Sequence, residues 1–179
     1  MLSNQNIEDT DLISGCLAGD RRSQKQLYDK YSAKMYAVCL RYMGNADDAQ
    51  DILQDGFIKV YKNLDKFRGE GSFEGWMRRI MANTAIEQLR RKKLTFSMAD
   101  KAEQIELKAP GAVDNLSEKD LLKIVSELSP GYRTVFNMYV VEGFGHKDIA
   151  DALGISEGTS KSQLARARVI LQEKVKNLK

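Results

Sequence analysis

Residues 47–93 read DDAQDILQDGFIKVYKNLDKFRGEGSFEGWMRRIMANTAIEQLRRKK, two helical patterns separated by a glycine-rich turn. In the first pattern Asp47, Asp51 and Asp55 are four residues apart, so a helix would align them on one face. The opposite stripe is apolar: Ile52, Phe57, Ile58, Tyr61 and Leu64. Like charges at this spacing repel by a few tenths of a kcal/mol per pair. The acidic face is therefore either solvated or suited to a basic partner.

The turn that follows, residues 67–73, is too rich in glycine to continue a helix, so its aromatic residues are expected on a loop. Residues 76–93 then predict a second helix, on which Arg79, Asn83 and Arg90 share a polar face. An acidic surface and a basic, aromatic surface thus lie within fifty residues of each other. This separation indicates two different partners.

Composition favours a helical, globular chain, with 42% hydrophobic residues and only two prolines among 179 residues. The net charge of +3 conceals two basic clusters. Residues 78–93 carry six bases and one acid, and residues 157–179 carry six bases and two acids. Helix C-termini favour Lys and Arg through the dipole, but this explains both clusters less well than a nucleic-acid partner does.

The order of patterns predicts an all-α fold of two small helical domains, 1–93 and 117–179, joined by an acidic flexible linker at 94–116. In the first domain, Asp11 is expected to cap a short helix ending at Ala18, and residues 23–43 form a long one. Asn45 is expected to cap the acid-faced helix. In the second, helices are expected to open at Ser117 and at Ser129-Pro130.

The sharpest local motif is a helix-turn-helix near the C-terminus. Residues 146–153 predict a short helix, Gly154 permits the turn, and a second helix runs from Glu157 to about Lys176. The second helix is expected to enter the major groove, although a helical corner without a DNA role has the same pattern. Its outward candidates, with Gln163 and Arg166 suited to bidentate base contacts, are Ser156, Thr159, Lys161, Ser162, Gln163 and Arg166.

No catalytic or metal site is expected. His146 is the only histidine, and Cys16 and Cys39 are predicted to be small buried hydrophobic residues. Phosphate-binding and nucleophile motifs are absent, so no cofactor and no small-molecule substrate are expected. Without a signal pattern or an apolar run of about 20 residues, the protein is expected to be soluble and cytoplasmic.

Four segments in this order resemble the extracytoplasmic-function (ECF) group of the sigma-70 family, which keeps two globular domains called regions 2 and 4. The matching segments are 47–55, 67–76, 79–91 and 129–168. The resemblance implies a bacterial sigma factor, itself not an enzyme, that binds core RNA polymerase, directs it to promoters and promotes their opening. It also implies an anti-sigma factor, most often held at the membrane.

The resemblance assigns a role to each surface. The acid-faced helix would dock on the clamp helices of the polymerase large subunit through Asp47, Asp48, Asp51, Gln54 and Asp55. The loop and the next helix would bind the minus-ten element through Lys66, Phe67, Arg68, Ser72, Phe73, Trp76, Arg79, Asn83 and Arg90, although Trp76 fits a core position equally well. The six outward residues of the last helix would bind the minus-thirty-five element.

The sequence departs from the sigma-factor pattern at two positions, and it is also compatible with two other classes of protein. Ser160 stands where many family members have an apolar residue, and Gly75 is unusual unless it lies in the first helical turn. Residues 47–51 also spell the DDxxD magnesium motif of isoprenoid synthases, but a second acidic motif is missing. A DNA-binding regulator that uses only the helix-turn-helix is the other alternative.

Overall fold

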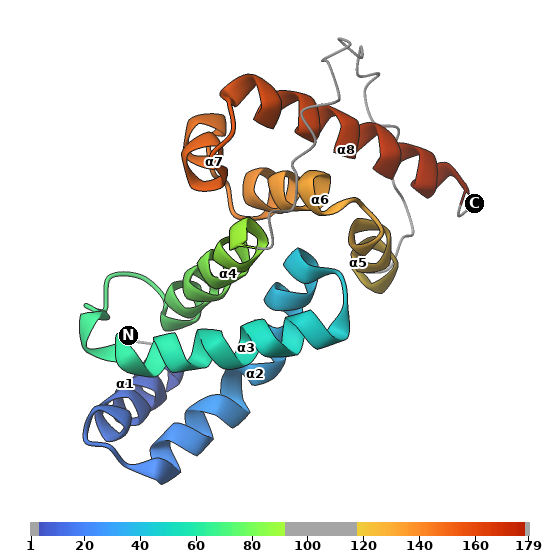
Figure 1. Ribbon diagram of the computed structural model, residues 1–179. Coiled ribbons are helices and arrows are strands. Elements are labelled where there is room, and N and C mark those ends of the chain that lie inside the picture. Colours follow the sequence, from blue (N-terminus) through green and yellow to red (C-terminus); the bar gives the residue numbers. More distant parts are fainter. Residues whose placement is uncertain (1–3, 92–117, 178–179) are drawn as a thin grey trace. The chain divides into compact units, whose positions relative to one another are not determined.

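The computed structural model describes residues 4–91 and 118–177, and within these ranges all regular secondary structure is helical, which confirms the all-α prediction. The described chain forms two compact units: unit 1 comprises residues 1–39 and 47–85, and unit 2 comprises 40–46 and 86–179. The expected linker at 94–116 lies outside the described residues, as do Lys92, Lys93 and Ser117. Figure 1 shows the helices, whose bounds are α1 Asn4–Leu17, α2 Arg21–Met43, α3 Ala46–Lys62, η1 Leu64–Lys66, α4 Phe73–Arg91, α5 Glu118–Ser126, α6 Pro130–Phe136, η2 Asn137–Val141, α7 His146–Leu153 and α8 Glu157–Asn177.

Unit 1 is built around the buried stripe of α3, which repeats at three- and four-residue intervals as an amphipathic helix requires. The residues of this stripe are Ala49, Ile52, Leu53, Gly56, Phe57 and Val60. Leu27 and Met35 of α2, together with Met77 and Met81 of α4, are fully buried in the same unit. The buried thiols of Cys16 and Cys39 confirm that both cysteines are core residues, and burial raises the pKa of Cys39 to about 12.

Helix α1 begins seven residues before Asp11, so the expected cap position was wrong. Asp9, inside the helix, accepts hydrogen bonds from the Tyr31 hydroxyl at 2.6 and 2.7 Å and from the Lys30 ammonium at 2.9 Å. These contacts fix α1 against α2. A polar N-terminal segment without an apolar period gives no sequence signal for such a tertiary contact.

Gly56 lies directly against the Met81 side chain of α4. A Cβ atom built at this position would lie 2.1 Å from the sulfur of Met81, which is itself fully buried. Glycine costs about 1 kcal/mol relative to alanine inside a helix, so its presence here reflects packing, not helix propensity.

Gly56→Ala is therefore expected to destabilise the protein, because overpacking costs about 1–3 kcal/mol and exceeds the gain in helix propensity. Thermal and urea unfolding measure the change. Met81→Ala in the same background should make room for the added methyl group, so the double variant should lose less than the sum of the two single changes. An additive double variant would contradict the proposed close contact.

Unit 2 contains the predicted helix-turn-helix, with α7 at one end of α8 and α6 beside α8 (Figure 1). Gly154 ends α7 in the left-handed conformation (φ +68°), and the Ile155 amide donates to the Ala150 carbonyl at 3.1 Å. The apolar residues buried in these helices are Val135, Met138, Ile149, Ala150, Leu153, Leu164 and Ala167. The turn chemistry expected from Gly154 is thus present.

Pro130 occupies the first turn of α6 as predicted, but the helix does not continue unchanged towards Gly143. Residues 137–141 form the π-helix η2 instead. Beside it, the buried Arg133 donates through Nη1 to the carbonyls of Ser126 and Leu128, at 2.7 and 2.9 Å. Burial lowers the pKa of Arg133, and these bonds compensate for the desolvation of its charge.

Candidate functional site

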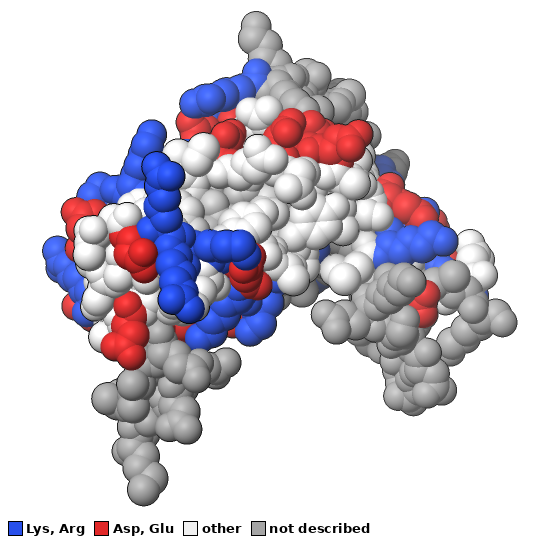
Figure 2. Space-filling model, turned by 90° about the horizontal axis from the view of Figure 1, so that it is seen from below, with Lys and Arg blue, Asp and Glu red and all other residues white. Residues whose placement is uncertain are grey.

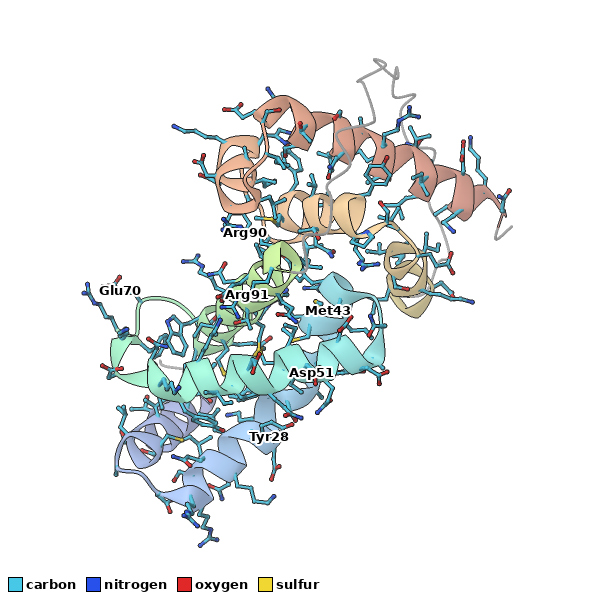
Figure 3. The ribbon with its side chains drawn as sticks, in the orientation of Figure 1. Tyr28, Met43, Asp51, Glu70, Arg90 and Arg91 are labelled. Atoms are coloured by element: carbon cyan, nitrogen blue, oxygen red, sulfur yellow. The ribbon has the colours of Figure 1, made fainter. Side chains whose placement is uncertain are left out.

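The acidic face of α3, defined as Asp47, Asp51, Gln54 and Asp55, is exposed along the whole helix. Asp48 is half-buried. Figure 3 labels Asp51 on this helix. Ile58, one turn beyond Gln54 and 51% exposed, adds an apolar side chain to the same face. The sequence placed Ile58 in the buried stripe, which is wrong, because Phe57 and Val60 already fill the inward positions.

The three aspartates Asp47, Asp51 and Asp55 form no ion pair or hydrogen bond through their side chains with any residue in the described ranges. Their mutual repulsion is therefore uncompensated inside unit 1. An exposed anionic row with an apolar side chain at its end fits a partner surface that offers cations around an apolar contact.

The loop after η1 carries three neighbouring aromatic rings. The ring centroids of Phe67 and Phe73 lie 5.1 Å apart, those of Phe67 and Trp76 5.5 Å, and those of Phe73 and Trp76 5.7 Å in a stacked pair. Phe67 and Trp76 are half-buried, whereas Phe73 is only 4% exposed and also meets Tyr31 edge-on at 5.8 Å. Phe67 and Trp76 thus expose part of their rings to solvent, and the buried Phe73 packs against both.

Phe73 is therefore not the exposed loop residue that the sequence predicted. It is the first residue of α4, and helix entry turns its side chain into the core of unit 1. The loop itself is confirmed between η1 and Ser72, where Gly69 and Gly71 adopt left-handed conformations (φ +75° and +92°). Lys66, Arg68 and Glu70 are exposed around it, and Glu70 is labelled in Figure 3.

Ser72 has a structural role that its place among the DNA-binding candidates did not anticipate. Its hydroxyl oxygen accepts a hydrogen bond from the Gly75 amide at 3.0 Å, which is the N-cap geometry for α4. Gly75 accordingly lies in the first helical turn, so its low helix propensity costs little there. The sequence signal was a serine directly before the apolar Phe73, with the acidic Glu74 in the first turn.

Arg79, Asn83 and Arg90 are all exposed, and their spacing of four and seven residues places them on one side of α4. Met77 and Met81 occupy the buried side. Arg90 and Arg91, labelled in Figure 3, continue the basic charge to the last turn of the helix. Figure 2 shows one face of the structure, with Lys and Arg residues coloured separately from Asp and Glu residues.

Helix α8 presents a short polar row at its N-terminal end. The Ser156 hydroxyl oxygen accepts a hydrogen bond from the Thr159 amide at 3.0 Å and so caps the helix. Lys161 is exposed, and Thr159, Ser162 and Arg166 are half-buried. Hydroxyl and cationic groups of this kind bind phosphates and base edges when a helix enters the major groove.

Gln163 does not belong to this row. It is 6% exposed, and its side-chain oxygen has no hydrogen-bond partner among the described residues. The buried residues Ser160, Gln163, Leu164 and Ala167 follow the helical period of the core stripe. That period was present in the sequence, but the polar nature of glutamine suggested an outward position.

Three residues that sequence reasoning did not assign to a site, Tyr139, His146 and Arg168, form a cluster that joins α8 to its neighbours. The Arg168 guanidinium lies 5.8 Å from the ring centroid of Tyr139, and the His146 ring stacks on the same tyrosine at 4.6 Å. No sequence pattern links positions 139, 146 and 168, because the contact joins η2, α7 and α8.

Comparison with known proteins agrees with this organisation. Residues 27–95 match the family model described as Sigma-70 region 2, and residues 118–171 match Sigma-70, region 4. The chain is 29% identical to RNA polymerase sigma-H factor of Pseudomonas aeruginosa, covering 96% of this chain and 95% of the relative. It is 28% identical to ECF RNA polymerase sigma factor SigW of Bacillus subtilis, covering 89% and 92%.

A solved structure of the sigma factor RpoE in complex with the anti-sigma factor NepR from Bartonella quintana is also similar, with a TM-score of 0.50 and 27% identity. The similarity covers 85% of this chain and 96% of RpoE. The matches to sigma-70 regions 2 and 4, on an all-helical chain with a helix-turn-helix, assign the protein to the transcription initiation factors. The chain belongs to the sigma-70 family, in its ECF group, and as a sigma factor it directs RNA polymerase to promoters.

Sigma factors are non-enzymatic initiation factors, and no group of three or more His, Cys, Asp or Glu residues that could hold a metal ion occurs in residues 4–91 or 118–177. Residues 47–51 lie within the match to sigma-70 region 2, so the family assignment replaces the isoprenoid-synthase interpretation of the DDxxD motif. A search of the same residues for a helix long and apolar enough to cross a membrane finds none.

The cap assigned to Ser72 gives a direct prediction. Ser72→Ala should lower the free energy of unfolding by about 1 kcal/mol, because one orphan amide of α4 loses its acceptor. Ser72→Asp should retain most of that stability, since its carboxylate accepts the same bond and lies at the positive end of the helix. Urea unfolding compares the two. Equal stability of the alanine variant and the wild type would contradict the capping role.

Proposed function

We propose that this sigma factor binds its partners through three separate surfaces. The acidic face of α3 docks on core RNA polymerase, the loop at 67–72 with the start of α4 captures the minus-ten element, and α8 recognises the minus-thirty-five element. The functional domains are 1–93 and 117–179, with 94–116 as the connection between them. The observation that carries the proposal is the exposed, unneutralised row of Asp47, Asp51 and Asp55.

Docking through α3 is supported by charge and by shape. The acidic face repels itself in the free protein, so a cationic partner surface gains attraction and removes repulsion at the same time. Ile58 provides an apolar contact that leaves solvent when a partner covers the helix. The clamp helices of the polymerase large subunit are the partner that the family relationship suggests.

Promoter opening is supported by the two accessible rings. Extracting a base from duplex DNA costs a few kcal/mol, and stacking on an aromatic side chain returns about 1–3 kcal/mol per base. Phe67 and Trp76 can supply this surface, while the buried Phe73 holds both rings in place. Lys66, Arg68, Arg79, Asn83 and Arg90 would then follow phosphates and adjacent bases.

Recognition of the minus-thirty-five element rests on the exposed end of α8. Ser156, Thr159, Lys161, Ser162 and Arg166 lie in the first turns of the helix, where helix-turn-helix proteins contact base edges. Gln163 supports the helix from inside and makes no base contact. Its burial leaves Arg166 as the side chain best suited to a bidentate base contact.

The proposal extends to partners and location. A related sigma factor occurs in complex with an anti-sigma factor. We therefore propose that an anti-sigma factor held at the membrane also binds this chain. The protein acts in the cytoplasm, where polymerase and promoter DNA are, and has no catalytic activity or small-molecule substrate of its own.

Reversal of the acidic face tests the docking surface. Asp51→Arg with Asp55→Arg should abolish co-elution with bacterial core RNA polymerase, since both charges would repel a basic partner. The matched control is Asp11→Arg with Asp29→Arg, which makes the same change in net charge at exposed positions of α1 and α2. Binding by the control and not by the variant supports the docking surface.

The same experiment separates the sigma factor from a simple DNA-binding regulator. If the wild type binds duplex DNA sequence-specifically by itself and does not bind polymerase, the proposal is wrong and the regulator interpretation takes its place. If the control variant also fails to co-elute with polymerase, the loss of binding is an effect of net charge. That result would contradict α3 as the specific docking surface.

Replacement of Phe67 tests base capture. With a promoter fragment selected by the holoenzyme from a random duplex pool, Phe67→Leu should reduce open-complex formation about tenfold, the equivalent of one lost stacking contact. Phe67→Tyr keeps the ring and should remain close to wild type. Permanganate reactivity of unpaired thymines reports opening, and equal opening by the leucine variant would contradict the assignment.

A further inference from the structure

His146 links the two helices of the helix-turn-helix at a point away from the turn. It is the first residue of α7, and its Nδ1 atom lies 2.9 Å from the hydroxyl oxygen of Ser160 in the first turn of α8. Ser160 has no exposed surface. The bond therefore ties the start of the first helix to the start of the recognition helix.

Ser160 is flanked by residues of the DNA-binding row. Thr159 precedes it and Lys161 follows it, so any rotation of the helix at Ser160 moves both neighbours. The apolar contacts of α7 and α8 fix how closely the helices approach, but such packing is non-directional. A hydrogen bond adds direction, since it requires a donor and an acceptor at about 2.7–3.2 Å in a defined orientation.

The histidine ring is itself held in place. It stacks on Tyr139 of η2, with ring centroids 4.6 Å apart and planes 23° apart. Arg168, two turns after Ser160 on α8, approaches the same tyrosine. The recognition helix thus contacts its neighbours at two positions: Ser160 contacts His146 of α7, and Arg168 contacts Tyr139 of η2. Because His146 stacks on Tyr139, the two contacts are connected.

We propose that His146 is a positioning residue for the recognition helix, and that its hydrogen bond to Ser160 holds α8 in the orientation that binds the minus-thirty-five element. This inference rests on the proposed function of α8.

Burial favours the uncharged form of the His146 ring most strongly, and the neighbouring charges contribute further. Lys161 and Arg168 of α8 oppose a positive imidazolium, Glu157 of α8 favours it, and Tyr139 is the titratable group of η2 in contact with the ring. On α7 the adjacent charged residues are Lys147 and Asp148. The N-terminus of α7 also disfavours a cation. Burial, followed by the two cations, lowers the pKa of His146 below its usual 6.5.

The sign of the pH effect follows from this direction. Because the folded protein holds the proton less tightly than the unfolded chain, the contribution of neutral His146 is fully present above pH 6.5. It is lost as the pH falls from there through the lowered pKa. The free energy of unfolding of the wild type should fall over the same interval. The bond to Ser160 can persist in both forms, since a protonated ring donates from Nδ1 to the hydroxyl oxygen.

The test uses holoenzyme assembled from the full chain and core polymerase, with the selected promoter fragment as probe. His146→Phe keeps a ring on Tyr139 without the hydrogen bond, and Ser160→Ala removes the partner. Each should weaken promoter binding about three- to tenfold at pH 7.5, the value of one hydrogen bond, and leave polymerase binding unchanged. The double variant should be no weaker than either single variant, because both remove the same bond.

Rescue by a conservative variant separates positioning of the helix from a role in stability alone. His146→Gln can bond to Ser160 without titrating, so it should bind the promoter within about twofold of wild type at pH 7.5. Its free energy of unfolding should lack the fall below pH 6.5 that the wild type shows. Since the chain has one histidine, its imidazole proton resonance follows the titration without assignment ambiguity.

Several outcomes would overturn the inference. Wild-type affinity for both single variants, or a double variant equal to the product of the single effects, would show that the bond does not position α8. Stronger promoter binding at low pH by the wild type alone would make the imidazolium a phosphate contact. Failure of the wild-type holoenzyme to select any promoter would reject the proposed function instead.

Discussion

Helix α3 buries an apolar stripe on one side and exposes a row of aspartates on the other, and one helical period fixes both. Its inward stripe, from Ala49 to Val60, fills the centre of unit 1, and Gly56 brings it against Met81. The same period forces Asp47, Asp51 and Asp55 outward, where they repel each other. Hydrophobic burial supplies roughly 1.5–3 kcal/mol for each large apolar side chain and easily exceeds this repulsion. The core therefore maintains a charged surface that is unfavourable on its own, and the proposed docking on a basic partner would remove this repulsion.

Much of the fold could be predicted because several signals agreed locally. The acid-faced helix, the proline start of α6 and the glycine turn at Gly154 each combine a period with turn or cap chemistry. The start of α1 and the π-helix η2 could not be predicted, since neither carries a local signal. Asp9 finds its partners on α2, and η2 differs from an α-helix only in which backbone groups are paired.

Errors in the candidate site share one cause, which is that residue type was given more weight than helical position. Phe73 and Gln163 have side chains suited to DNA, yet both fall on buried stripes. Ser72 and Ser156 also have suitable hydroxyls, and each is already used as a cap. A hydroxyl that accepts one amide bond keeps further capacity, so capping and phosphate contact are compatible for serine. A buried ring or amide has no such freedom.

Helix α8 shows how closely support and recognition alternate along one segment. Thr159, Lys161 and Ser162 face outward, while Ser160, Gln163 and Leu164 face the core, so substitutions in the outward set leave the packing stripe intact. Sequence preference can therefore change without loss of the fold. Ser160 is the exception, because it is both buried and polar. A buried polar group requires a hydrogen-bond partner, and for Ser160 this partner is His146. Under the inference above, the orientation of the recognition helix therefore depends on a hydrogen bond in addition to apolar packing.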